Sequence, residues 1–377
     1  MKQIHTWAAL AACFLLQAGA ALAEAPSIHN SGPPEAPINV IFDTDMWSDI
    51  DDAMALAMLH ALQDRREINL LAVTISTSEK WCASYVDLID TFYGHPQIPI
   101  GLIRNGLDAS AFRKKYPTGT WPVTRYTQIL AEKRNQSGSL VYPHKLIDGN
   151  DAPETVALLR KTLAAQPDGS VVIVEVGYTT NLARLLDSTP DAFSPLRGVD
   201  LIRQKVRLLS VMAGNFAQST FAGTLIPKGS AEFNLASDVP SAQTVFSTWP
   251  TPIVDSGYEV GLALLFPAVS IERDFSYVYH HPVADTYRTY AEETKRWPHN
   301  HPTYDLTAVL YAARPDRNYF SLSQPGRITV LDNGGSRFEE REDGTHRHLI
   351  LSEEQKARAL EAMVMLVSQP PRRTKQP

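Results

Sequence analysis

Short apolar segments rich in β-branched residues alternate along this chain with segments of helical spacing, and this alternation restricts the folds open to it. The apolar segments are residues 39–42, 70–75, 98–103, 171–176, 206–213 and 252–255, and the helical ones are residues 52–62, 85–93, 153–165, 181–186 and 241–246. Short continuous apolar runs are typical of buried parallel strands, which helices connect. The pattern therefore predicts an α/β fold with a mostly parallel, doubly wound, Rossmann-like sheet flanked by helices. Such sheets bind ligands beyond the carboxyl ends of their strands.

The 377-residue chain divides into four predicted parts. Residues 1–23 combine basic Lys2, an apolar run and an A-x-A cleavage site, which together predict a signal peptide. Residues 24–37 are rich in proline and predict an extended arm, and residues 369–377 predict a flexible tail. Residues 38–368 are expected to form a single domain, which from residue 305 onward contains a helix, short strands and a closing helix over residues 353–367.

Export and charge limit the compartments and partners that we expect. Once the signal peptide is cleaved, Cys82 is the one cysteine left, so no intramolecular disulfide can form in a periplasmic or secreted protein. A lone thiol in an apparent helix is expected to pack rather than to act as a nucleophile. The net charge of -6 gives no reason to expect nucleic acid. The leader's apolar run is shorter than the roughly 20 residues of a membrane span, so we expect no membrane partner after cleavage.

Five aspartates directly follow the first apolar segment in the stretch VIFDTDMWSDIDDAMAL, namely Asp43, Asp45, Asp49, Asp51 and Asp52. Carboxylates this close together need a cation, hydrogen-bond donors or water to offset their charge. Asp51 and Asp52 can be explained as acids at a helix N-terminus. Asp43 and Asp45 lie two apart on a strand, and their carboxylates are expected to point to the same side. Because all of these ligands are oxygens, the cluster predicts a hard cation such as Ca²⁺.

Three more polar elements lie further along the chain. Asp305 begins the apolar helix in HPTYDLTAVLYAA, and Glu232 and Asn234 lie two apart in AEFN, beyond the strand that ends in SVMAGNF. The chain leaves another strand at Val176 and Gly177, in VVIVEVGYTTNLARLL. Each element alone has a simple structural explanation, as a helix cap, a polar turn or a turn glycine.

In this order, however, the elements resemble the inosine/uridine-preferring nucleoside hydrolase family, calcium enzymes that release the base from a ribonucleoside. DTDMWSDIDDAMAL resembles the family's D-x-D…D-D-A signature, with two extra residues before the final pair. VGYTTNLARLL is similar to G-P-L-T-N-x-A, VMAGNF to M-G-G-x-F, AEFN to A-E-F-N, and YDLTAVLYA to the late H-D-P-x-A segment. The resemblance covers residues 39–313, and more loosely extends to residue 350.

The resemblance implies Ca²⁺ as the cofactor, bound by Asp45, Asp52, Asp305 and the backbone carbonyl of Val176. The ion would also hold the ribose hydroxyls and the attacking water, and Asp45 would take the proton of that water. The implied reaction is hydrolysis of the N-glycosidic bond of a small-molecule ribonucleoside to ribose and free base. Its transition state resembles an oxocarbenium ion, which carboxylates stabilise.

The resemblance also implies residues that bind the sugar. Asp51, Glu232 and Asn234 match residues that bind ribose hydroxyls, and Met212 stands where the family lines the sugar pocket. Family members are oligomeric, so a homo-oligomer is expected, although no stretch of this sequence identifies an interface.

The chain departs from the family pattern at positions that affect the leaving base. Tyr304 stands where the family carries a histidine that protonates the base, and the expected Gly-Asn after the second strand is replaced in TISTSEKW. An asparagine expected shortly before AEFN is also absent from TLIPKGS. Without the acid, poor leaving groups such as uracil suffer most, so we expect weak or purine-leaning activity.

Several residues near these departures have open interpretations. Tyr304 would donate a proton to the base or stack on it, while His299 and His301 are either substitute acids or solvated loop residues. Trp47, inserted in the signature, either lines the base pocket or is a packed surface aromatic. Asp49, from the same insertion, is either an acid behind the site or a helix cap.

Two other functions compete with hydrolysis. A periplasmic protein that kept the calcium and ribose ligands but lost turnover would bind ribose or nucleosides, and the missing residues agree with such drift. Alternatively, IFDTD resembles the nucleophile motif of haloacid-dehalogenase-type phosphatases. The phosphatase hypothesis explains neither AEFN nor the pair Asp51 and Asp52.

Overall fold

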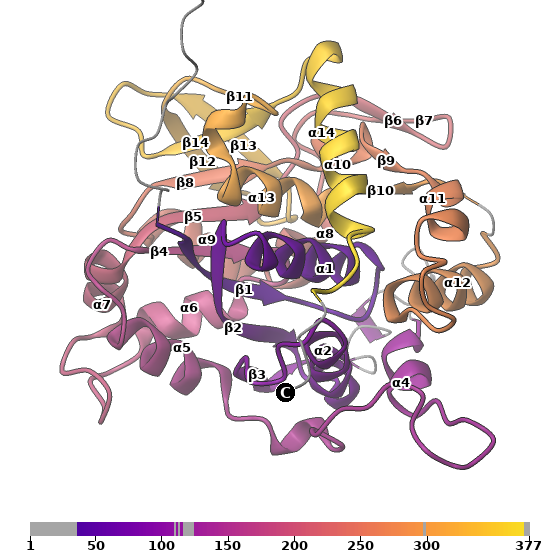
Figure 1. Ribbon diagram of the computed structural model, residues 1–377. Helices are drawn as coiled ribbons and strands as arrows, with labels where there is room; N and C mark the ends of the chain where they lie inside the picture. The colour runs from indigo at the N-terminus through magenta and orange to yellow at the C-terminus, as the bar shows by residue number, and fades with distance from the viewer. Residues whose placement is uncertain (1–35, 109–110, 112–113, 116–123, 297–298, 373–377) are drawn as a thin grey trace, which may run out of the picture. The chain divides into compact units, whose positions relative to one another are not determined.

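The computed structural model of the protein describes residues 36–108, 111, 114–115, 124–296 and 299–372 (Figure 1). The predicted signal peptide, most of the predicted arm and residues 373–377 lie outside these ranges. From Pro37 onward the chain forms one compact unit. In the described ranges, no helix has both the length and the apolar character needed to cross a bilayer.

A large sheet forms the centre of this unit (Figure 1). Its described strands are β1 (Ile38–Thr44), β2 (Ile68–Thr77), β3 (Ile100–Leu107), β4 (Val171–Glu175), β5 (Val206–Met212), β8 (Ile253–Ser256), β11 (Ser321–Leu322), β12 (Gly326–Val330), β13 (Ser336–Glu340) and β14 (His346–Ile350). Neighbouring strands are parallel from β3 through β2, β1, β4, β5 and β8 to β14. Strands β11, β12 and β13 pair in antiparallel fashion at the β14 edge.

The direction of strand addition reverses at β1. After β1 the chain adds β2 and β3 on one side, then returns to add β4, β5 and β8 on the other. The loops that follow β1 and β4 therefore leave the sheet side by side in opposite directions, and a crevice opens between them. Two small antiparallel pairs lie outside the large sheet, β6 (Ser219–Phe221) with β7 (Thr224–Ile226) and β9 (Leu265–Phe266) with β10 (His301–Pro302).

Helices cover both faces of the sheet (Figure 1). The described α-helices are α1 (Asp51–Asp64), α2 (Lys80–Phe92), α4 (Tyr126–Ala131), α5 (Thr155–Ala164), α6 (Thr180–Asp187), α7 (Gly198–Lys205), α8 (Phe233–Ser237), α9 (Val239–Thr248), α10 (Tyr258–Leu262), α11 (Ala268–Arg273), α12 (Pro282–Thr294), α13 (Tyr304–Ala313) and α14 (Glu353–Val367). One layer contains α1, α2, α13 and α14, and the other contains α5, α6, α7 and α9.

The two layers build two hydrophobic cores, one on each side of the sheet. In β1, Val40 and Phe42 join the core under α1 and α13, whereas Ile41 joins the core under α5 and α6. This division follows from the alternation of side chains along a strand. Helix α1 is buried almost all round, as expected for the apolar sequence AMALAMLHAL.

The prediction of a mostly parallel, doubly wound α/β sheet is confirmed, and the differences lie at element ends and in short elements. Helix α2 begins at Lys80 rather than at residue 85, and β3 begins at Ile100 rather than at residue 98. Several short elements, including the β6–β7 hairpin and helices α8, α10 and α11, carry too few residues for a periodic pattern to be detected.

Candidate active site

A cavity of about 350 Å³ lies beyond the carboxyl ends of β1, β4 and β5, where the strand order reverses. The residues that the family resemblance assigned to the metal, the sugar or the base all line it: Asp45, Asp51, Asp52, Val176, Met212, Glu232, Asn234, Tyr304 and Asp305. These residues come from loops and helix ends spread over 260 positions of the chain, so the tertiary structure brings them together. Their individual roles remain predictions.

The acids of the cavity are buried, and each one makes the ionised form of its neighbours less stable. Burial and the charge of Asp51 raise the pKa of Asp45 to about 8. A hydrogen bond from Tyr178 acts in the opposite direction and lowers this pKa, but it does not outweigh burial. Burial and the charge of Asp49 raise the pKa of Asp51 to about 7. Burial and the neighbouring acids hold the pKa values of Asp52 and Asp305 well above the ordinary range.

The donor set suits a hard divalent cation. One carboxylate oxygen from each of Asp51, Asp52 and Asp305 lies within 4.8 Å of the other two. Asp45 Oδ2 is buried and accepts no hydrogen bond from any residue in the described ranges. A buried carboxylate oxygen normally has a partner, and a cation would supply one here while offsetting the mutual repulsion.

Asp51 and Asp52 lie in the first turn of α1, where the helix dipole favours acids, but neither carboxylate caps the helix with a hydrogen bond. Helix α1 begins at Asp51 and shows no side-chain capping bond. Instead Asp51 Oδ2 accepts a hydrogen bond of 3.0 Å from the backbone N–H of Asp305, at the start of α13. Asp52 Oδ1 accepts a hydrogen bond from the Thr44 hydroxyl at the end of β1. These bonds fix the positions of both carboxylates at the junction of α1, α13 and β1.

The loop after β4 comes very close to Asp45, and glycine makes this possible. A Cβ at Gly177 would lie 2.5 Å from the backbone nitrogen of Asp45 and 2.5 Å from Ser76 Oγ. Beside it, the Val176 carbonyl accepts a 3.0 Å hydrogen bond from Asn234 Nδ2. A carbonyl oxygen has two lone pairs, so this bond leaves one for a cation.

Glu232 and Asn234 form the opposite wall of the cavity. Glu232 caps helix α8, because its carboxylate accepts backbone N–H bonds from Asn234 at 2.9 Å and from Leu235 at 3.1 Å. Burial raises the pKa of Glu232 to about 7. Asn234 Nδ2 also donates to the Met212 carbonyl at 3.1 Å, which ties the end of β5 to the start of α8.

Tyr304 and Tyr258 form an aromatic wall. Their rings stack with centroids 5.1 Å apart and an interplanar angle of 20°, and both line the cavity. Tyr258 begins α10 just beyond β8, so its place after a strand end was a signal that the sequence interpretation did not use. Tyr290, Arg296 and Asn300 also line the cavity, and no local pattern in their segments identifies them.

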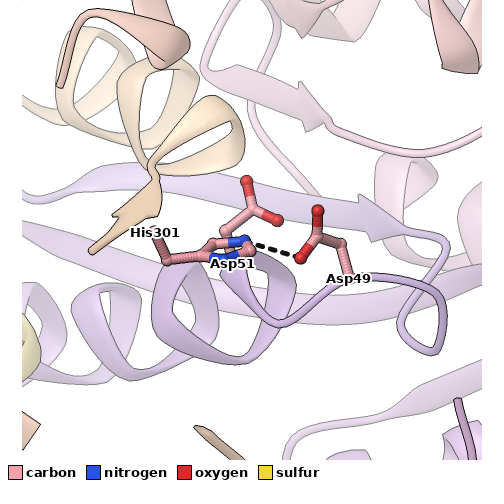
Figure 2. Close-up of side chains that lie close together, drawn as sticks. All are labelled: Asp49, Asp51 and His301. Carbon is pink, nitrogen blue, oxygen red and sulfur yellow. Dashed lines mark ion pairs between the residues drawn. The ribbon is translucent and has the colours of Figure 1, made fainter. Parts of the chain in front are cut away.

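The inserted residues of the signature have distinct positions. Asp49 lines the cavity and forms an ion pair with His301, whose Nε2 lies 2.6 Å from Asp49 Oδ1 (Figure 2). His301 is only 3% exposed, so the alternative of a solvated loop residue is wrong for it. Trp47 is 2% exposed and belongs to the hydrophobic core rather than to the cavity wall or the surface.

The prediction that the carboxylates of Asp43 and Asp45 point to the same side is wrong, because only Asp45 lines the cavity. Asp43 is fully buried, accepts a 2.9 Å hydrogen bond from Asn181 Nδ2, and is absent from the cavity wall. Asp45 lies beyond the end of β1, where strand alternation no longer applies. The phosphatase hypothesis requires Asp43 as an accessible nucleophile, and its burial argues against that hypothesis.

Cys82 is also fully buried, and burial raises its pKa well above the ordinary range, as expected for a packing residue.

The sequence model of the family described as inosine-uridine preferring nucleoside hydrolase matches residues 40–358 of the chain. The chain belongs to this family. Nucleoside hydrolases cleave the N-glycosidic bond of ribonucleosides, and this protein is accordingly an N-ribohydrolase. No protein in a search of curated sequences matches it.

Solved structures of nucleoside hydrolases share the fold. A purine-preferring ribonucleoside hydrolase from Gardnerella vaginalis superposes with a TM-score of 0.63 at 16% identity, covering 88% of this chain and 98% of that chain. An inosine-uridine preferring nucleoside hydrolase from Bacillus anthracis gives a TM-score of 0.60 at 17% identity, covering 88% of this chain and 99% of that one. At such low identities the similarity establishes the nucleoside hydrolase fold, and the site must be argued from this chain's own residues.

Proposed function

We propose that this nucleoside hydrolase uses Ca²⁺, prefers purine ribonucleosides and acts in the periplasm or outside the cell as a homo-oligomer. The observation that carries the calcium proposal is the buried, all-oxygen acid cluster, in which Asp45 Oδ2 has no partner among the described residues. Asp45, Asp52, Asp305 and the Val176 carbonyl would bind the ion. When bound, Ca²⁺ would orient and polarise the attacking water.

The chain's own residues would perform the remaining steps. Asp51, Glu232 and Asn234 are buried and line the cavity, so they can bind ribose hydroxyls where bulk water does not compete. Asp45 lines the cavity with one buried carboxylate oxygen that accepts no hydrogen bond from the described residues, and it would accept the proton of the attacking water. The surrounding carboxylates would stabilise the positive charge that develops on the sugar.

The aromatic wall supports the purine preference. Tyr304 stands in the position of the family's leaving-group histidine, and its stacking on Tyr258 offers a broad apolar face to a base. Burial raises the pKa of Tyr304 far above neutrality, so its hydroxyl is a weak acid. A purine offers a larger surface for stacking than a pyrimidine does. The structurally similar hydrolase from Gardnerella vaginalis is itself described as purine-preferring.

The experiment is a measurement of reducing-sugar release from inosine, guanosine, adenosine, uridine and cytidine by the mature protein, with calcium and with chelator. We expect calcium-dependent release with purines ahead of pyrimidines. Asp45→Asn should abolish release, whereas Asp64→Asn, a change in a buried acid at the far end of α1, should retain it. Faster release from uridine than from the purine nucleosides would refute the base preference. Calcium and ribose binding without release would favour the binding-protein alternative.

A further inference from the structure

The ion pair between Asp49 and His301 is one part of a longer array on the cavity wall. His301 Nε2 lies 2.6 Å from Asp49 Oδ1 (Figure 2), and His301 Nδ1 lies 3.1 Å from His299 Nε2. All three residues line the cavity, and both partners of the ion pair have a ligand atom within 4.8 Å of Asp51, which is predicted to bind ribose. The array therefore borders the predicted sugar site.

The protein holds this array firmly from several sides. The rings of Tyr287 and Tyr290 in α12 pack edge-on against His301, with centroids 6.1 and 5.4 Å away. On the opposite side, Tyr126 donates a 2.7 Å hydrogen bond to the backbone carbonyl of Asp49. Thr124 similarly donates a 2.7 Å bond to the carbonyl of Trp47 in the same loop. The loop between β1 and α1 and the segment before α13 are thus fixed relative to each other.

The charges that face His301 decide its protonation. These are the carboxylates of Asp49 and Asp51, the guanidinium of Arg296 and the imidazole of His299, with the hydroxyls of Tyr287 and Tyr290 nearby. Burial alone would lower the pKa of His301, but the charge and hydrogen bond of Asp49 outweigh it and raise the pKa above the ordinary value. Burial and the charge of His301 lower the pKa of His299. These opposite shifts favour the shared proton on His301 rather than on His299.

We propose that His301 is the acid that protonates the departing base in this nucleoside hydrolase, with Asp49 and His299 as the residues that position it. The inference rests on the proposed function. It assigns protonation of the base to residues 49, 299 and 301, because Tyr304, which occupies the family's position for this acid, is only a weak acid.

The network also identifies the proton that leaves. When His301 is protonated, its Nδ1–H can donate to the Nε2 lone pair of neutral His299 across 3.1 Å, and this bond holds the proton on Nδ1. The Nε2–H beside Asp49 is then the one available for transfer. Asp49 thus has two effects, since its charge favours the protonated form of the buried imidazole and its carboxylate holds the transferable proton at the cavity wall.

The bonds of the reaction balance. The glycosidic bond breaks and its electron pair moves to the base nitrogen, while the His301 Nε2–H bond breaks and its electron pair remains on Nε2. The proton forms a new N–H bond on the base. Water adds to the sugar carbon and gives its proton to Asp45. After the products leave, Asp45 releases one proton to solvent and His301 takes one up, so that the net change is nucleoside plus water to ribose plus base.

The test compares two leaving groups in the same variants. Inosine needs an acid to protonate its base, whereas 4-nitrophenyl β-D-ribofuranoside releases a stable phenolate that needs none. We expect His301→Gln and Asp49→Asn to lower kcat/KM for inosine by about 100-fold or more, in line with general-acid contributions. The same variants should lose far less activity toward the nitrophenyl riboside, so the ratio of the two rates should fall. Turnover of the nitrophenyl riboside also reports that each variant is folded.

Two further variants sharpen the comparison. His299→Gln changes the more exposed member of the array, and it should lower the same ratio without removing a fully buried ring. The matched control is His280→Gln, which breaks another histidine–aspartate pair, to Asp285 at 3.3 Å, outside the cavity. Its ratio should equal that of the unmodified protein. Equal losses for both substrates, or no loss for either, would overturn the assignment and leave the array as a structural support. No release from either substrate by the unmodified protein would instead refute the proposed function itself.

The pH profile gives an independent reading. The alkaline limb of kcat/KM for inosine should lie above the ordinary histidine value near 6.5, because Asp49 stabilises the cationic ring. In Asp49→Asn this limb should move to lower pH, because the largest interaction that opposes burial is lost. An unmoved limb would contradict the assignment.

Discussion

Replacing Asp305 by asparagine should have opposite effects on stability with and without calcium. The side chain of Asp305 lies in the group of three carboxylates whose oxygens approach within 4.8 Å. Asparagine has nearly the same shape and retains the backbone N–H that donates to Asp51. The substitution therefore removes one ionisable acid from the cluster without opening a cavity.

The size of the effect follows from the separation of the charges. Two carboxylates 4.8 Å apart repel by about 3.5 kcal/mol at an effective dielectric constant of about 20. Proton uptake by the neighbouring acids limits the total, so we expect calcium-free Asp305→Asn to be more stable than the unmodified protein by about 3 kcal/mol. With calcium at about 100 times its dissociation constant, the unmodified protein should gain about 2.7 kcal/mol, and the variant should gain much less.

The effect should also depend on pH with a defined sign. Because burial raises the folded-state pKa of Asp45 to about 8, the calcium-free fold is most stable below the ordinary carboxylate value. That stability is lost as pH rises toward about 8. The stabilisation by calcium should therefore be larger at about pH 8 than at about pH 5.

The assay is urea unfolding followed by circular dichroism, with saturating calcium and with chelator. The matched control is Asp255→Asn, which removes another fully buried carboxylate whose pKa burial raises, outside the cavity wall. This control should shift both unfolding curves by the same amount and keep the calcium response. If calcium-free Asp305→Asn is less stable than the unmodified protein, or if it responds to calcium as strongly, the cluster is not a cation site of the kind argued above.

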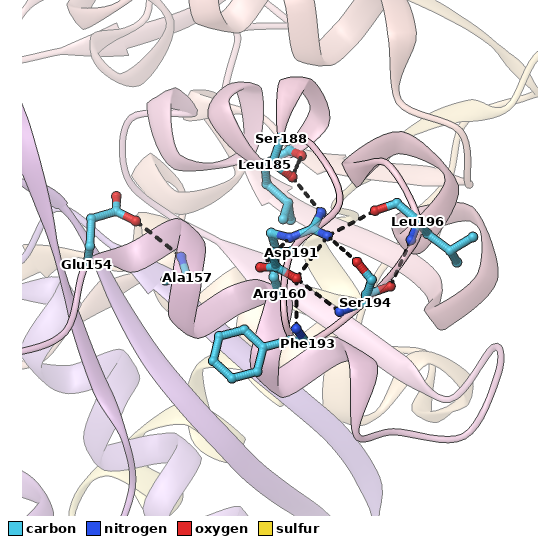
Figure 3. Close-up of polar contacts among 9 residues, drawn as sticks. All are labelled: Glu154, Ala157, Arg160, Leu185, Ser188, Asp191, Phe193, Ser194 and Leu196. Carbon is cyan, nitrogen blue, oxygen red and sulfur yellow. Dashed lines mark hydrogen bonds and ion pairs between the residues drawn. The ribbon is translucent and has the colours of Figure 1, made fainter.

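Three further substitutions test other parts of the structure. Gly261→Ala should reduce ribose release, because its Cβ would lie 2.4 Å from the Cα of Tyr304 and displace the start of α13. Arg160→Met should cost about 3–5 kcal/mol in urea unfolding but leave kcat unchanged, because this buried guanidinium bonds the loop after α6 far from the cavity (Figure 3). His346 accepts a 3.1 Å bond from the N–H of Ile328, and burial lowers its pKa to about 4. The free energy of unfolding should therefore fall as the pH drops from 6.5 to about 4. The fall should be about 3 kcal/mol larger in the unmodified protein than in His346→Asn, and urea unfolding at each pH measures it.

Local patterns determined much of the fold. Continuous apolar runs placed β1, β2, β4, β5 and β8 within a few residues of their observed bounds, because a strand buried on both faces is predominantly apolar. The resemblance of five segments to family motifs also identified many of the residues that line the cavity, and parallel strands bring these segments to one edge of the sheet. Element ends and short helices were less predictable, because they depend on contacts that lie far away in the sequence.

The sequence by itself thus determined an α/β sheet, an acid cluster at the end of its first strand and membership in the nucleoside hydrolase family. Only the tertiary structure decided how the inserted residues are used. It buries Trp47 in the core, turns Asp43 toward Asn181, and pairs Asp49 with His301 across 252 positions of the chain. These contacts join loops, which have no periodic pattern and whose course is set by the packing of α1, α12 and α13. Local chemistry selects the residues available to a site, and the packed elements select which of them meet.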